Sequence, residues 1–191
     1  QALTDVEAIK DLLPDDRDVV VVCAHGGSSG MLVEMLDRPG VVNLDGGMNR
    51  WATTLVPRVL FDDGRQFVIQ LDRVAKACLS YAVGERGSTM AVIDPAADAA
   101  ADTAIAEAMG ASITDIFDTH LHADHISLGV HMATDLGATY HIAAGDAEGA
   151  TFAFESLRDG MVFTFGALEL VVRSVATPGH TPGSTSLEVG G

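Results

Sequence analysis

The sequence contains little cysteine, little lysine and no long apolar run. Cys23 and Cys78 are the only cysteines among 191 residues, which is too few for a disulfide framework and favours a reducing, cytoplasmic compartment. No apolar stretch is long enough to cross a membrane, and the chain does not open on a charged and then apolar leader. The sequence therefore predicts neither a membrane span nor a signal peptide.

Positive charge is also scarce. Aspartate and glutamate number 27 against 11 lysines and arginines, so the formal net charge is −16. Nucleic acids and anionic membrane surfaces would repel such a chain, which excludes them as expected partners. Hydrophobic residues make up 48% of the sequence, enough for the core of one domain with room for part of a second.

A dense cluster of metal-ligand side chains stands near the middle of the chain. His120, His122, Asp124 and His125 directly follow the apolar run 113–117, which reads as a buried strand. Residues two apart in extended backbone point the same way, so His120 and His122 can converge on one ion. Imidazole and carboxylate together suit zinc, iron or manganese, and the lack of thiolate argues against a closed structural zinc site.

A second segment adds a histidine in a fixed turn. His180 follows another strand-like run, 168–175, and has a Pro-Gly pair on each side. Proline and glycine in these places define a tight turn and hold the imidazole at a set angle. Together with the first cluster, the turn predicts that His180 is a further metal ligand.

Cys23 lies in the first quarter of the chain, at the end of a run of four valines. A Gly/Ser loop and a helical pattern over 31–36 follow it. Backbone N–H groups and the helix dipole at such a place lower a thiol pKa, which makes Cys23 a candidate sulfur carrier. A small buried hydrophobe at a strand end is the alternative interpretation, and the residues alone leave both open.

The remaining pattern predicts alternating strands and helices. Helices are expected over 98–109 and 127–136, and short strands on either side of them. His131 falls on the second helix and is expected to be exposed, whereas the pattern leaves open whether His141 lies on the surface. Pro57 marks the expected domain boundary.

The histidine cluster, the Pro-Gly-His180 turn and the strand and turn 90–95 resemble the metallo-β-lactamase superfamily. This resemblance covers roughly residues 58–191 and implies an α/β (α+β) fold, the N-terminal part of an αββα sandwich. Residues 1–57 resemble the C-terminal half of a rhodanese domain, although Ser28 stands where an arginine is frequent. The superfamily also takes an aspartate and a last histidine from further downstream, so the domain 58–191 is expected to be incomplete at its C-terminus.

Within the superfamily, the Thr-His-x-His-Ala-Asp-His form is similar to persulfide dioxygenases linked to rhodaneses. These enzymes oxidise glutathione persulfide with O2 to sulfite. The resemblance implies one Fe(II) held by His120, His180 and an aspartate beyond this chain. His122, Asp124 and His125 would then orient water and the ligands.

A dinuclear zinc thioester hydrolase of the glyoxalase II type is the alternative. That resemblance implies that His120, His122 and His180 bind one Zn(II), and that Asp124 and His125 help to bind a second. Both readings imply a small thiol-based substrate. A third alternative, of another class, is an inactive fragment or a sulfur-carrier module.

Overall fold

The computed structural model describes residues 6–96, 98–122, 127–166 and 170–190. The chain divides into two compact units, Gln1–Thr54 and Leu55–Gly191, where the sequence predicts a boundary at residue 57. Within the described ranges, no helix is long and apolar enough to cross a membrane.

The first unit contains one small parallel sheet and three helices. Strands β1 and β2 pair in parallel, with Val19 opposite Val41. The helix predicted from residue 31 begins earlier, at Gly27, and includes the Gly/Ser loop residues. Helix α3, which forms after β2, is not predicted from the sequence. The bounds are α1 Val6–Lys10, β1 Val19–Val21, α2 Gly27–Leu36, β2 Val41–Asn43 and α3 Gly47–Thr53.

The second unit is built on a seven-stranded sheet in the order β3-β4-β5-β6-β7-β8-β9. The strands from β3 to β6 pair in antiparallel fashion, and those from β6 to β9 in parallel. Their bounds are β3 Val56–Asp62, β4 Gln66–Arg73, β5 Cys78–Glu85, β6 Thr89–Ile93, β7 Ser112–Phe117, β8 Thr139–Ala143 and β9 Glu155–Leu157.

Three further strands form a separate antiparallel sheet, β10-β11-β12. Their bounds are β10 Val162–Phe165, β11 Leu170–Ala176 and β12 Thr185–Val189. The turn between β11 and β12 carries His180. The backbone N–H of Thr185, at the start of β12, donates a 2.8 Å hydrogen bond to the Thr119 carbonyl. This contact joins the second sheet to the segment that carries the first histidines.

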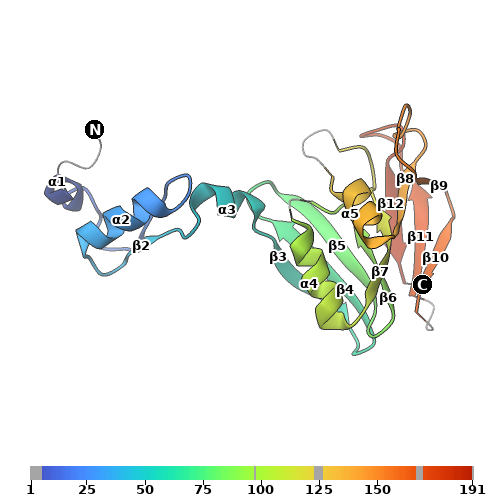
Figure 1. Ribbon diagram of the computed structural model, residues 1–191, viewed down its shortest axis with the longest axis horizontal. Coiled ribbons are helices and arrows are strands. Elements are labelled where there is room, and N and C mark those ends of the chain that lie inside the picture. The colour runs from blue at the N-terminus through green and yellow to red at the C-terminus, as the bar shows by residue number, and fades with distance from the viewer. Residues whose placement is uncertain (1–5, 97, 123–126, 167–169, 191) are drawn as a thin grey trace. The chain divides into compact units, whose positions relative to one another are not determined.

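Two helices cover one face of the large sheet, α4 Ala99–Met109 and α5 Gly129–Leu136, as Figure 1 shows. Alternate residues along the strands face opposite sides, so β6 divides its side chains between two cores. Met90 and Val92 pack with residues from the helices, whereas Ala91 and Ile93 pack with residues from the second sheet. The unit thus has a helix layer and two sheet layers, which confirms the expected mixed α/β class.

Local capping explains where α4 lies. The Asp98 carboxylate accepts a hydrogen bond from the Ala100 N–H at the start of the helix, and Gly110 ends it in the left-handed region at φ 61°. The sequence predicts the same end and a start one residue earlier. The helix returns the chain to β7, which runs parallel to β6 and brings the ends of both strands to one edge.

Candidate metal centre

Three histidines of the second unit lie together beside the end of β7. His120 and His122 follow the strand in a bend, and His180 comes from the turn between β11 and β12. The His120 ring centroid lies 4.2 Å from that of His122 and 4.9 Å from that of His180. Segments 60 residues apart in the sequence therefore place imidazoles side by side.

These separations suit a shared ion. With metal–nitrogen distances of about 2.0–2.1 Å and tetrahedral angles, two imidazoles on one ion have centroids roughly 5 Å apart. Burial lowers the pKa of His120, and the neighbouring His122 lowers it further. The ring is therefore neutral at physiological pH, the form that binds metals. The donor set and its spacing fit a divalent metal.

Asp94, which follows β6, holds the segment that carries these histidines. Its carboxylate accepts hydrogen bonds from the Thr119 N–H at 2.7 Å and the Thr119 hydroxyl at 2.8 Å. Its backbone lies in the left-handed region, at φ 51°, where non-glycine residues are uncommon and are often functional. Ile93 is opposite Phe117 in the parallel pairing. The residues that directly follow the two strands therefore lie next to each other.

The hydrogen bonds around Asp94 hold one nitrogen of each ring. The Thr119 hydroxyl donates to Asp94 and lies 2.9 Å from Nδ1 of His120, from which it accepts. Nε2 of His122 lies 3.1 Å from an Asp94 oxygen and donates to it. The chain thus anchors Nδ1 of His120 and Nε2 of His122, which fixes the orientation of both rings.

Asp118 is the second carboxylate beside His122. It is almost fully buried and accepts hydrogen bonds from the Ser127 hydroxyl at 2.8 Å and the Tyr140 hydroxyl at 2.7 Å. Burial raises the pKa of this carboxyl above its usual range, against the effect of the two hydroxyl donors. One oxygen lies 3.9 Å from Nε2 of His122.

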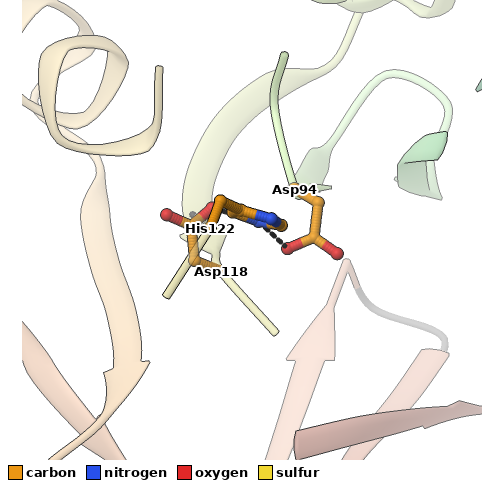
Figure 2. A group of neighbouring side chains, drawn as sticks. All are labelled: Asp94, Asp118 and His122. Carbon is orange, nitrogen blue, oxygen red and sulfur yellow. Dashed lines mark hydrogen bonds and ion pairs between the residues drawn. The ribbon is translucent and has the colours of Figure 1, made fainter. Parts of the chain in front are cut away.

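Asp94, Asp118 and His122 could themselves hold a metal ion, since each offers a ligand atom within 4.8 Å of the other two. Figure 2 shows the His122 ring turned toward the Asp94 carboxylate, with Asp118 on its other side. All four carboxylate oxygens already accept hydrogen bonds from hydroxyl or backbone donors. This favours the two aspartates as supports for the His122 ring.

The other candidate residues from the sequence are exposed, buried or outside the described ranges. Asp124 and His125 lie outside the described residues. His131 is exposed on α5, as expected. His141 is only 1% exposed. It stacks on Phe117 at 4.5 Å between ring centroids, and its Nε2 hydrogen-bonds Asp115 at 2.8 Å.

Cys23, in the first unit, lies in a loop that suits a thiolate. Its sulfur accepts hydrogen bonds from the Gly26 N–H and the Ser29 hydroxyl, each at 3.1 Å. The hydrogen bond from Ser29 is the main cause that lowers the pKa of Cys23 to about 6. Gly47 closes the loop from the other side, where a Cβ atom would lie 2.3 Å from the Cys23 carbonyl oxygen. The thiol is therefore largely ionised at neutral pH.

Asp94, Asp118 and Thr119 are not predicted as site residues from the sequence. One signal could have found Asp94 and Asp118: each directly follows a buried strand. If the two strands are neighbours in a parallel sheet, their ends share one edge, where α/β folds collect functional residues. That the strands are neighbours is known only from the structure.

Comparison with known proteins identifies the family. The family described as the metallo-beta-lactamase superfamily matches residues 73–191, well over half of the chain. The chain belongs to the metallo-beta-lactamase superfamily. A rhodanese-like domain matches residues 1–54 of this superfamily member.

Curated relatives of this metallo-beta-lactamase superfamily chain include two hydrolases. The hydroxyacylglutathione hydrolase of Acidiphilium cryptum is 38% identical over 97 residues, which are 51% of this chain and 39% of that protein. A probable metallo-hydrolase of Burkholderia pseudomallei is 31% identical over 138 residues, 56% of this chain and 46% of its own length. The chain thus spans less than half the length of these relatives.

Two solved structures share the fold. ETHE1 from Myxococcus xanthus superposes with a TM-score of 0.53 at 28% identity, over 70% of this chain and 53% of its own. A metallo-beta-lactamase from Staphylococcus aureus superposes with a TM-score of 0.60 at 24% identity, over 66% of this chain and 39% of its own. At that identity, the second likeness shows the fold alone.

Proposed function

We propose that the protein to which this chain belongs is a persulfide dioxygenase that uses one Fe(II). The observation that carries the proposal is the pairing of two features on one chain. One is a metallo-beta-lactamase domain with clustered histidines, and the other is a rhodanese-like segment with a low-pKa cysteine. A carrier of sulfane sulfur beside an enzyme that oxidises it would form one pathway. The likeness to ETHE1 supports this reading.

The reaction would be glutathione persulfide + O2 + H2O → glutathione + sulfite + 2 H⁺. The terminal sulfur is oxidised by four electrons, and O2 is reduced by the same four. A ferrous ion would supply open positions for the persulfide sulfur and O2. His120 and His180 would hold it with an aspartate beyond this chain, and Thr119 would fix the His120 ring through Nδ1.

Cys23 would carry sulfur to or from the pathway. Its thiolate is held by the Gly26 N–H and the Ser29 hydroxyl, and the same donors would stabilise a persulfide anion on that sulfur. If Cys23 carries sulfur, a sulfane donor such as thiosulfate should add the mass of one sulfur atom to the chain. Cys23→Ser should abolish this gain, and Cys78→Ser should not.

A dinuclear zinc thioester hydrolase is the second candidate. The names of several curated relatives, hydroxyacylglutathione hydrolases, favour it. The anchored Nε2 of His122 also fits this reading, because it prepares Nδ1 as a metal ligand. Two zinc ions would supply the Lewis acidity to activate water for attack on a thioester carbonyl. Asp124 and His125 would help to hold the second ion.

The test is made on the full-length protein, purified anaerobically without chelator. A dioxygenase should hold about one iron per chain and should consume O2 only when glutathione persulfide is added. His120→Ala and His180→Ala should abolish this uptake. Asp124→Ala should weaken it by about 10–100-fold, through the orientation of ligands and water. His131→Ala, on the exposed face of α5, is the matched control.

Two zinc ions per chain, with thioester cleavage and no O2 uptake, would reject the dioxygenase and support the hydrolase. Neither activity in the full-length protein, together with sulfur loading on Cys23, would support the sulfur-carrier module instead.

A further inference from the structure

Asp146 lies between the two segments that carry the histidines. It follows β8 in a short turn and is 8% exposed. The position is 24 residues after His122 and 34 before His180 in the sequence. None of the proposed roles of the histidines uses this carboxylate.

Both carboxylate oxygens of Asp146 are directed to these segments. One oxygen accepts a 2.9 Å hydrogen bond from the N–H of Leu121, the residue between His120 and His122. The same oxygen accepts from the hydroxyl of Thr181, the residue after His180. The other oxygen accepts a 2.7 Å hydrogen bond from the Gly183 N–H, three residues after His180.

The backbone approaches this carboxylate closely. A Cβ atom on Gly183 would lie 2.7 Å from both Cγ and an oxygen of Asp146, so only glycine fits there without moving the acid. Burial favours the neutral acid, but the hydrogen bonds from Thr181, Leu121 and Gly183 hold the pKa of Asp146 below its usual range. The group is therefore a carboxylate, which accepts shorter and stronger hydrogen bonds than a neutral acid.

We infer that Asp146 is a positioning residue that clamps the His180 turn against the His120–His122 segment. It would act on the metal only through its hydrogen bonds to these two segments. The two segments come from different sheets, so their relative placement sets how far apart the imidazoles lie. The inference rests on the proposed metal site and adds the group that assembles it.

The test measures zinc affinity of the whole chain in a Cys23→Ser background, which removes a competing thiolate. Asp146→Ala should weaken zinc binding by about 10–100-fold, the usual effect of removing a group that orients ligands. Gly183→Ala displaces the carboxylate without removing its charge and should weaken binding in the same direction. Asp98→Ala, which removes the cap of α4, is the control for a general loss of stability.

A double-mutant cycle with His180→Ala separates a clamp from a merely structural role. If Asp146 acts mainly by placing His180, the effect of Asp146→Ala should fall to about twofold once the His180 ring is gone. An equal loss in both backgrounds, or an affinity of Asp146→Ala within about twofold of its parent, would overturn the inference.

Amide exchange in the metal-free chain tests the clamp independently of any metal. The N–H groups of Leu121 and Gly183 should exchange faster in Asp146→Ala than in the parent, whereas Asp98→Ala should leave them unchanged. If the parent binds no zinc, the proposed metal site fails and exchange alone decides the clamp. Unchanged exchange at both amides would refute it.

Discussion

Replacement of Asp102 by asparagine should make the stability of the Leu55–Gly191 unit less dependent on pH. Asp102 is 0% exposed on α4, and neither carboxylate oxygen has a hydrogen-bond partner among the described residues. Burial, and then the nearby charge of Asp98, raise its pKa from 3.8 to about 7. The folded unit therefore keeps a proton that the unfolded chain releases.

The direction of this pH dependence follows from how many protons the folded and unfolded states bind. Between the two pKa values the folded state binds more protons, so the free energy of unfolding falls as pH rises. A difference of about three pKa units, at about 1.4 kcal/mol each, makes the loss roughly 4 kcal/mol between about pH 4 and about pH 8. Asparagine has the shape of the neutral acid but does not titrate, so Asp102→Asn should not show this loss of stability.

The assay is urea unfolding at the two pH values, followed by the near-ultraviolet signal of Tyr81 and Tyr140 in this unit. The stability of Asp102→Asn relative to wild type should rise by roughly 4 kcal/mol from the acidic to the alkaline condition. Asp135→Asn, an exposed carboxyl on α5, is the matched control and should show little change. A parallel pH dependence for wild type and Asp102→Asn would refute the reasoning.

Two predictions concern the supports of the proposed sites. Ser29→Ala should raise the pKa of Cys23 above 6, because the serine hydroxyl is its main stabilising donor. The pH dependence of alkylation measures this, with the exposed Ser28→Ala as control, and an unchanged profile would contradict it. Asp94→Asn should weaken zinc binding by about 10–100-fold, because the anchor of His122 is lost. Titration with a zinc indicator would detect this, and an unchanged affinity would speak against that anchor.

Local chemistry made parts of this fold predictable from the sequence. Asp98 and Gly110 cap α4 through their own backbone and side-chain preferences, and the helix predicted over 98–109 matches α4 to within one residue. The helix α3 was missed because it begins at a glycine pair, Gly46 and Gly47, which on local preference reads as a turn.

The support of the candidate site could not be predicted in the same way. Asp146 acts on Leu121 and Thr181, which lie 25 and 35 residues away in the sequence. Such contacts depend on strand order and on how the second sheet packs, and neither follows from local patterns. His141 is a similar case: its burial depends on Phe117 and Asp115 of the neighbouring strand.

Cobalt(II) binding by this chain tests the central claim most directly, namely that His120 and His180 share one metal ion. In a Cys23→Ser background, one equivalent of cobalt(II) should give the visible absorption spectrum of a low-coordinate cobalt ion with nitrogen ligands. His180→Ala should change that spectrum and weaken binding, whereas His131→Ala should do neither. An identical spectrum and affinity for His180→Ala and its parent would contradict the account, because the turn between β11 and β12 would then supply no ligand.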